Sequence, residues 1–333
     1  MKIRIATFNV ENLDDKVDQR LPLSTRIKVL RPQLFRLKAD IICFQEVHGQ
    51  ETNGQARDIL ALKEVLKETP YENFHIISTK TANRRDVYDE RNLVVISKYP
   101  FDGEPQQINN DIIDPIKFNY VTDKGENADK AKNVGWERPL FYVKVKIDNN
   151  NIIHVINLHL KSRIASSIAG QKINTFTWKT NSAWAEGYFV SSMKRVGQAL
   201  ETRMFIDQIF DGEPDAKIVV CGDFNANPLE VPVEAICGKV SNTGNAELNP
   251  YELVACENTI PESSRYTYLY QGQKRLLDHI LISKALMPCY RTSEIHNETL
   301  RDESIAFAYD TKFPESDHAP FLIELELDVI ETV

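Results

Sequence analysis

Short apolar runs recur along this chain, and several of them alternate strictly with polar residues. In residues 2–10, Ile3 and Ile5 alternate with Lys2 and Arg4, a period typical of a half-buried β-strand. Comparable runs predict further strands at residues 40–46, 74–78, 92–97, 139–147, 152–160, 217–221, 277–282 and 320–327. An Asp-Asn-Asn-Asn tract at 148–151 separates the predicted strands at 139–147 and 152–160 and is typical of a hairpin turn.

Three other segments carry apolar residues at helical spacing. Residues 24–37 and 55–69 each place an apolar side chain every three or four positions, which predicts amphipathic helices. Residues 184–210 predict a longer helix, with Leu200 and Met204 on its buried face. An Asp-Gly-Glu-Pro-Asp stretch follows that helix and is expected to end it, because Gly and Pro interrupt helical structure.

The order of these elements predicts the fold class. Strands come in hairpins and runs, with helices between some of them, which favours an α+β sandwich of two mixed sheets with helices outside. We find no linker-like tract, internal repeat or low-complexity segment, so we expect residues 1–333 to form one domain. The polar, Asp- and Asn-rich stretch at about 102–133 is expected to be a long surface excursion.

The charge and the cysteine content limit the possible functions. A net charge of −8 argues against a protein that coats nucleic acid non-specifically, although it leaves open a phosphodiester substrate that meets a local basic surface. The five cysteines are odd in number and scattered, without a Cys-x-x-Cys pair. This pattern disfavours a disulfide framework or a zinc site and favours a reducing compartment.

The chain shows no membrane or export signal. No apolar run reaches transmembrane length, so no membrane partner is expected. The N-terminus enters a strand pattern directly, without the apolar core of a signal peptide, and we expect a cytoplasmic location. The sequence leaves open whether a signal peptide was removed from a longer precursor. The sequence carries no oligomerisation signal, and a monomer is expected.

Polar clusters stand at the ends of several apolar runs. Asp223 and Asn225 follow one such run, and their i, i+2 spacing on an extended segment aims both side chains the same way. A carboxylate beside a carboxamide suits a divalent metal and a phosphate oxygen. Similar clusters occur at 8–12, 44–48 and 316–320, which predicts a single metal-assisted site built from strand ends.

Taken in chain order, these motifs resemble the endonuclease/exonuclease/phosphatase superfamily, the fold of pancreatic-type deoxyribonuclease and abasic-site endonucleases. One Gly-Asp-Phe-Asn motif alone would be weak evidence, but the ordered set is highly specific and covers almost the whole chain. The resemblance implies a four-layer α/β/β/α sandwich with the active site at one end of the two sheets. The motifs lie at residues 7–12, 45–47, 91–97, 157–162, 222–225, 277–280 and 316–320.

The resemblance implies a metal site of hard oxygen ligands. Glu46 would be the principal ligand, Asn9 would orient the phosphate or a metal-bound water, and Glu11 would be a second acidic ligand. Asp317 is a further candidate ligand. Such a site suits Mg²⁺, with Mn²⁺ as a plausible substitute. The competing interpretations are a surface carboxylate for Glu46 and strand-end capping for Asn9 and Glu11.

The resemblance also implies the catalytic groups. His318 would be the general base that activates water, with Asp278 holding its imidazole and fixing its tautomer. His159 would protonate the leaving oxygen or stabilise the phosphate, and Glu90 falls near the position of a glutamate that pairs with this histidine in the deoxyribonuclease branch. For Glu90 the alternative is a solvated surface acid.

Asp223 and Asn225 would align the attacking water and bind the phosphoryl oxygen. The alternative for this pair is a β-turn, which Asp and Asn favour. Arg91 is a candidate phosphate contact, although an arginine beside a strand is more often solvated. His48 alternates with Glu46 and reaches either the site or its rim.

The segment at about 161–195 differs from the rest of the acidic chain. It contains six basic residues and one acidic residue, Glu186, which gives a local charge of +5. Phe176, Trp178, Trp184, Tyr188 and Phe189 are interleaved with the basic residues. Basic and aromatic side chains together can bind a nucleic-acid backbone and stack on bases. Alternatively, the segment tucks its aromatic side chains into the core before the long helix begins.

Three functional hypotheses follow. The first is a metal-dependent nuclease, with DNA as the expected nucleic-acid substrate and RNA left open, and the Asn-Leu-His-Leu-Lys-Ser stretch at 157–162 favours the nuclease branches. The second is a phosphatase or phosphodiesterase of the same fold that acts on a lipid, an inositol phosphate or a nucleotide. The motifs of the inositol-phosphatase branch are missing at 219–223 and 274–279, which disfavours that branch. The third is a non-catalytic interaction protein, which the intact polar positions disfavour.

Overall fold

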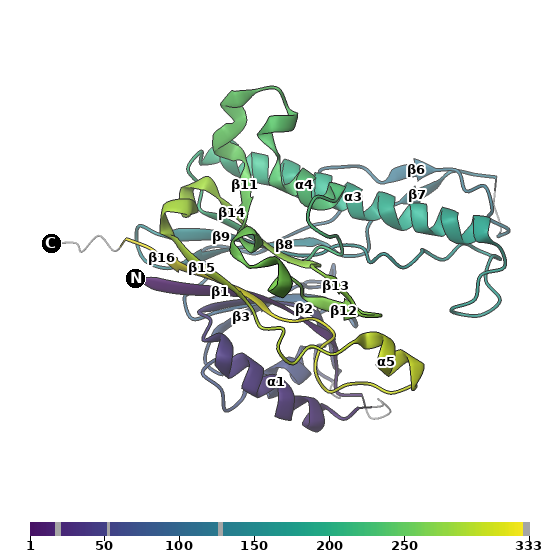
Figure 1. Cartoon of the computed structure of the whole chain (residues 1–333), viewed down its shortest axis with the longest axis horizontal. Coiled ribbons are helices and arrows are strands. Elements are labelled where there is room, and N and C mark those ends of the chain that lie inside the picture. The colour runs from purple at the N-terminus through teal and green to yellow at the C-terminus, as the bar shows by residue number, and fades with distance from the viewer. Residues whose placement is uncertain (17–20, 52–53, 126–128, 329–333) are drawn as a thin grey trace.

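Two six-stranded sheets pack face to face, and helices cover their outer faces (Figure 1). The computed structural model describes residues 1–16, 21–51, 54–125 and 129–328. Apolar side chains of both sheets fill the space between them, Ile5 and Cys43 from one sheet and Val155 and Val219 from the other. The predicted α+β sandwich of two mixed sheets with helices outside is therefore confirmed.

The first sheet has the order β15-β16-β1-β2-β4-β3. β1 and β2 are parallel, and the other neighbouring pairs are antiparallel. The carboxyl ends of β1 and β2 therefore meet at one end of this sheet. Its strands are β1 (Lys2–Leu13), β2 (Ile41–Val47), β3 (His75–Ser78), β4 (Asn92–Ser97), β15 (Tyr290–Ile295) and β16 (Phe321–Glu326).

The second sheet has the order β11-β14-β10-β9-β8-β5, with β9 and β10 parallel and the rest antiparallel. Its strands are β5 (Gln106–Ile108), β8 (Leu140–Lys146), β9 (Ile152–His159), β10 (Ile218–Asp223), β11 (Leu253–Ala255) and β14 (Asp278–Ser283). Two short ribbons lie outside the sheets. They pair β6 (Ile116–Phe118) with β7 (Lys132–Val134), and β12 (Tyr268–Tyr270) with β13 (Gln273–Arg275).

Helices form the two outer layers. α1 (Leu23–Leu37) and α2 (Leu60–Leu66) pack on the first sheet, while α3 (Asn181–Gly212) and α4 (Val231–Cys237) pack on the second. α5 (Glu303–Ala308) lies in the segment that precedes β16. Single 3₁₀ turns occupy Val240–Asn242, Ala246–Tyr251, Cys256–Thr259, Glu262–Ser264 and Lys284–Cys289.

Local hydrogen bonds explain where two helices differ from the prediction. The helix expected at 55–69 is formed only as α2, because Gln50 and Asp58 pair as a β-bridge and hold the preceding chain extended. α3 begins earlier than expected, since the Thr180 hydroxyl accepts a hydrogen bond from the Ala183 amide at 3.1 Å and caps the helix. Leu200 and Met204, expected on the buried face, are exposed instead.

Gly222 lies in β10, opposite Leu158 of the parallel neighbouring strand β9. Its φ is +140°, and a Cβ atom there would lie 2.0 Å from the carbonyl oxygen of Leu158. We expect Gly222→Ala to lower the free energy of unfolding by roughly 3 kcal/mol, because the strand must shift to relieve the overlap. Urea unfolding checks this value. Gly212→Ala is the matched control, since nothing lies within 4 Å of its Cβ position, and a similar loss there would contradict the steric argument.

His154 lies in β9, at the end of the strand opposite His159, and is buried. Its Nδ1 lies 2.8 Å from the Tyr142 hydroxyl, and burial lowers the pKa of the imidazole. As the pH falls below about 6.5, the unfolded chain binds a proton that the folded protein excludes, so stability decreases.

In His154→Gln, we expect stability to decrease less steeply with falling pH, between pH 6.5 and the lower pKa of His154 in the folded protein. The slope should be reduced by up to about 1.4 kcal/mol per pH unit. Urea unfolding at several pH values measures the slope. His75→Gln, which alters an exposed ring, should keep the wild-type slope. An unchanged slope in His154→Gln would show that another group causes the acid sensitivity.

Candidate active site

The predicted site residues gather at one end of the sandwich, where β1, β2, β9 and β10 end and β14 begins. Asn9 and Glu46 come from the first sheet, and His159, Asp223 and Asp278 from the second. The Asn9 side-chain amide donates a hydrogen bond to Asp223 Oδ2 at 3.1 Å, and this contact joins the two sheets. The segment before β16 adds His318 and Asp317.

Asp223 stands at the centre of this cluster and is buried. The Asn225 backbone amide donates to its Oδ1 at 2.8 Å, and the Asn225 side-chain amide donates to its Oδ2 at 3.1 Å. Burial raises the pKa of the Asp223 carboxyl. The ring nitrogens of two histidines approach the same oxygen, His159 Nε2 at 3.4 Å and His318 Nε2 at 3.9 Å. Asp223 is therefore placed to align a molecule held between the two imidazoles.

His318 and Asp278 form a buried pair. His318 Nδ1 lies 2.7 Å from Asp278 Oδ2, which fixes the ring and leaves Nε2 directed toward Asp223. Burial lowers the pKa of His318, but the carboxylates of Asp278, Asp223 and Asp317 outweigh it, and the pKa lies well above its usual value. The Tyr268 ring packs on the imidazole with centroids 5.3 Å apart.

His159 is also buried, and its environment keeps it neutral. Burial lowers its pKa, and the positive charges of Arg138 and other nearby cations lower it further. Nε2 lies 3.5 Å from Glu46 Oε1, while Nδ1 finds no hydrogen-bond partner among the described residues. Glu90 has an exposed side chain, so it does not supply the partner that the family resemblance suggested for this ring.

Acidic side chains crowd one side of the cluster. Burial and the charges of Glu11, Glu46 and Glu303 raise the pKa of Asp317 well above its usual value. Burial, together with Glu11, raises the pKa of Glu303 to about 7. Lys312 pairs with Glu11 at 3.2 Å, and the Asn12 amide donates to Glu46 at 3.0 Å. A divalent cation would relieve this repulsion, and carboxylate oxygens are suitable ligands for it.

A second arrangement of metal-binding atoms overlaps the first. Ligand atoms of Asp223, Asp278 and His318 lie within 4.8 Å of one another. In this trio, however, Asp278 and His318 already bond to each other, so the pair fits an oriented general base better than a ligand set. The ligand set that the family resemblance implies, Glu46, Asp317, Glu11 and Asn9, stays a prediction. Asp278 Oδ1 is buried without a hydrogen-bond partner in the described chain.

Cations also lie close enough to His159 to influence its imidazole. Arg138 is buried, and its guanidinium donates to the carbonyl oxygens of His159 and Leu160, both at 3.4 Å. Within the described chain, neither Arg138, Arg91 nor Lys161 forms an ion pair with an acid. These groups can therefore neutralise a phosphate. The sequence reasoning missed Arg138, although a cation directly before the apolar run at 139–147 was a usable signal.

The model of the endonuclease/exonuclease/phosphatase family matches residues 6–318. The chain belongs to this family. It is accordingly a phosphoric ester hydrolase, and the family typically depends on a divalent metal. No curated protein matches the chain significantly in sequence.

Solved structures of the endonuclease/exonuclease/phosphatase fold agree with the observed sandwich. Truncated TDP2 from Caenorhabditis elegans has a TM-score of 0.57 at 14% identity and covers 98% of both chains. The 3′ phosphatase NExo from Neisseria, bound to a product DNA hairpin, scores 0.53 at 16% identity over 98% of this chain and 100% of its own. An AP endonuclease from Archaeoglobus fulgidus scores 0.51 at 15% identity over 98% and 100%.

Two other histidines lie outside the catalytic cluster of this family member. His48 contacts Asp14 at 3.3 Å and the Asn12 side chain at 3.1 Å, so it belongs to the rim. His279 points to the opposite face of β14, where Nδ1 lies 2.5 Å from Glu257 and Nε2 lies 2.8 Å from the Ala226 carbonyl. The contacts of His279 are structural, since they connect β14 to neighbouring loops.

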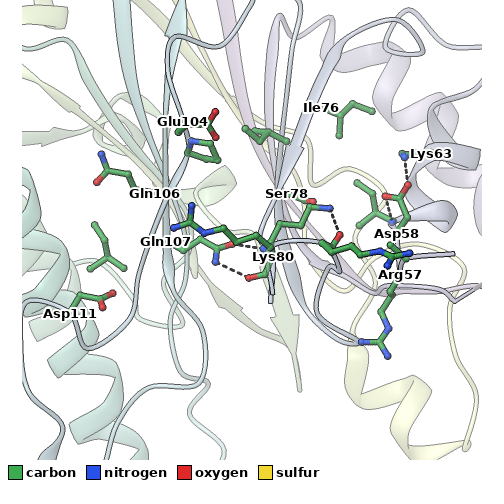
Figure 2. Close-up of a pocket in the computed structure, with 17 residues that line it drawn as sticks. Arg57, Asp58, Lys63, Ile76, Ser78, Lys80, Glu104, Gln106, Gln107 and Asp111 are labelled. Carbon is green, nitrogen blue, oxygen red and sulfur yellow. Dashed lines mark hydrogen bonds and ion pairs between the residues drawn. The ribbon is translucent and has the colours of Figure 1, made fainter. Parts of the chain in front are cut away.

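A pocket of about 890 Å³ lies elsewhere, between the edge strands β3 and β5 (Figure 2). Gln107 spans the two sheets there, and its side-chain amide donates to the Lys80 carbonyl at 2.8 Å. Among the described residues, those that line this pocket include none of the catalytic cluster. The pocket is therefore separate from the site of hydrolysis.

No helix in the described part of the chain is long and apolar enough to cross a membrane. All five cysteines are free.

Proposed function

We propose that this protein is a divalent-metal-dependent nuclease that hydrolyses phosphodiester bonds in DNA. The observation that carries the proposal is the division of charge around His159. Glu46 Oε1 lies 3.5 Å from the Nε2 of this ring, and Arg138 donates to the His159 backbone carbonyl at 3.4 Å. A scissile phosphate in this position would meet a metal and a fixed cation at once, which is what phosphodiester hydrolysis requires.

Glu46, Asp317, Glu11 and Asn9 would hold Mg²⁺, with Mn²⁺ as a substitute. The metal would supply a Lewis acid that neutralises charge on a phosphoryl oxygen. In the metal-free site, nearby carboxylates raise the pKa of His318. A bound cation would offset those charges, so that His318 Nε2 can take the proton from the attacking water while Asp278 holds the ring through Nδ1.

Other residues position the water and the phosphate. Asp223 and Asn225 align the water and the phosphoryl oxygen, and His159, which its environment keeps neutral, stabilises the phosphate as a hydrogen-bond donor. Arg138 and Arg91 offset the charge of the bound phosphate.

Support for a DNA substrate comes from two sources. The structure of the similar NExo enzyme holds a product DNA hairpin, and the similar Archaeoglobus enzyme is an AP endonuclease. The basic segment at 161–195 begins directly after His159. A second candidate function, removal of a terminal phosphate, is favoured by the description of NExo both as a 3′ phosphatase and as a 3′–5′ exonuclease.

A substrate panel tests the proposal. Supercoiled plasmid, single-stranded RNA, a 3′-phosphorylated DNA duplex and bis-p-nitrophenyl phosphate would be offered with Mg²⁺ or with EDTA. Asp223→Asn, purified in parallel, would exclude a contaminating nuclease. We expect Mg²⁺-dependent plasmid nicking. Release of phosphate from the duplex without nicking would favour the phosphatase, and cleavage of bis-p-nitrophenyl phosphate alone would point to a smaller substrate.

A further inference from the structure

The N-terminal half of α3 projects past the ends of the strands, beside β6 and β7 (Figure 1). It carries an exposed pair of aromatic side chains, Trp184 and Tyr188, which are 47% and 39% exposed. Their ring centroids lie 5.5 Å apart with 21° between the planes, so the rings are stacked. The aromatic side chains of this segment are therefore not all tucked into the core.

The helix that carries this pair is fixed in place. The Ser166 amide donates to the Gly187 carbonyl at 2.9 Å, and a Cβ on Gly187 would lie 2.8 Å from the Trp178 ring, so only glycine permits this packing. On another side of the helix, the Glu186 carboxylate accepts from the Thr122 amide at 2.8 Å. The pair is thus held before any ligand binds, which reduces the entropy lost on binding.

Trp184 and Tyr188 share a helical face with Arg195, which contacts the segment that follows His159. Trp184, Tyr188 and Arg195 fall on one face, because 4 and 11 residues are close to whole numbers of turns. Arg195 donates to the carbonyl oxygens of Lys161 and Ser162, at 3.0 and 3.2 Å, in the segment that directly follows His159. The face therefore leads outward from the site rim over about 16 Å, the length of three turns.

Charge near this face suits a polyanion. Lys161, Lys172 and Lys179 have no acidic partner within the described chain, and the single acid of the segment, Glu186, is engaged in anchoring the helix. Lys172 lies over the Trp178 ring at 4.8 Å, and Lys179 donates to the Gly170 carbonyl at 2.7 Å. Positive charge beside flat aromatic faces is the combination that binds single-stranded nucleic acid.

We propose that Trp184 and Tyr188 form a stacking platform for the bases of an unpaired strand that leaves the active site. This inference rests on the proposed nuclease function and adds a specificity: the protein prefers substrates with a single-stranded segment next to the scissile phosphate. The stacked, nearly parallel arrangement of the two rings argues for base stacking, since insertion into lipid or burial against a second copy does not require parallel ring faces.

The test combines Trp184→Ala with Tyr188→Ala. We expect KM for a single-stranded DNA oligonucleotide to rise about tenfold or more, because stacking of one base contributes about 1–3 kcal/mol. Turnover of bis-p-nitrophenyl phosphate should not change, since that substrate has no bases to stack. Trp184→Phe with Tyr188→Phe should restore most of the affinity. Met204→Ala is the matched control, as Met204 is 40% exposed on the same helix. An unchanged KM would overturn the platform.

A binding measurement separates this inference from the proposed function. Fluorescence anisotropy of a labelled single-stranded oligonucleotide would be recorded with His318→Ala, alone and combined with the two alanine changes. Weaker binding in the combined variant supports the platform even if no nucleic acid is cleaved. Absence of oligonucleotide binding in both proteins would overturn it. So would Trp184-dependent binding to anionic phosphatidylglycerol vesicles, or dimerisation in sedimentation, without any effect on the oligonucleotide.

Discussion

Replacing His318 by alanine should lower kcat for bis-p-nitrophenyl phosphate by about 10³-fold, because general-base catalysis contributes about 10²–10⁴-fold. The imidazole is the group whose Nε2 faces Asp223 while Nδ1 is bound by Asp278. Removing it leaves no other oriented base at that position, since His159 has a lowered pKa and its Nε2 already contacts Glu46 and Asp223.

Steady-state kinetics with saturating Mg²⁺ measures this loss. The variant should still be stabilised by Mg²⁺, because the proposed ligands are untouched, and thermal unfolding with and without the ion checks this. His75→Ala, which alters an exposed ring, serves as the control. A fall of less than tenfold in His318→Ala would assign the base to another group. Asp278→Asn should give a smaller loss, since the base remains but its tautomer is no longer fixed.

Glu46→Gln should weaken the binding of Mg²⁺ and Mn²⁺ by at least about 100-fold, since even residues that only support metal ligands contribute about 10–100-fold. The metal-free variant should be at least as stable as the wild type. The reason is that Glu46 is one of the charges that raise the pKa of Asp317, and its neutralisation relieves that repulsion.

Calorimetric titration of Mn²⁺ measures the affinity, and urea unfolding in EDTA measures the stability. Wild-type protein should gain about 2.7 kcal/mol when the metal concentration is 100 times its Kd, and the variant should gain little at that concentration. Glu104→Gln, which changes an exposed acid outside the cluster, should behave as wild type in both measurements. Unaltered metal affinity in Glu46→Gln would place the metal among other residues, with the Asp223, Asp278 and His318 trio as the next candidate.

The residues that the sequence predicts best are those in motifs at strand ends. Asp223 and Asn225 follow an apolar run with fixed spacing, and the structure places them against Asn9 from the other sheet. Asn225 lies beyond the end of β10, in a bend where its φ is +50°, so a turn and not the expected extended strand brings its side-chain amide to Asp223. The meeting of Asn9 with Asp223 across the sandwich followed from the family resemblance and not from local pattern.

Other parts depend on contacts that a local pattern does not record. Arg138 bonds to the carbonyls of His159 and Leu160 at the end of β9, and a cation placed before an apolar run does not specify these distant partners. In α3, Leu200 and Met204 are exposed while Glu201 is buried, since its carboxylate binds the indole N–H of Trp136 at 2.6 Å. Apolarity alone therefore selected the wrong face of that part of the helix.

Short edge strands were missed for a different reason. β5 and β11 have three residues each, too few to show a period, and they exist because a longer neighbour offers free backbone groups. The same holds for the β6 and β7 ribbon within the polar stretch expected to be a surface excursion. Their positions follow from the completed sheet and not from their own sequence.

The pairing of β1 with β16 has a consequence for biosynthesis. Lys2 lies opposite Glu326, so β1 must wait for β16 to be synthesised before these two strands can pair. His318 and Asp317 arrive with that same late segment. A nascent chain in which β16 has not yet formed therefore also lacks the proposed general base, His318, and one proposed metal ligand, Asp317. The long wait also predicts slow folding, since contacts between distant residues delay the transition state.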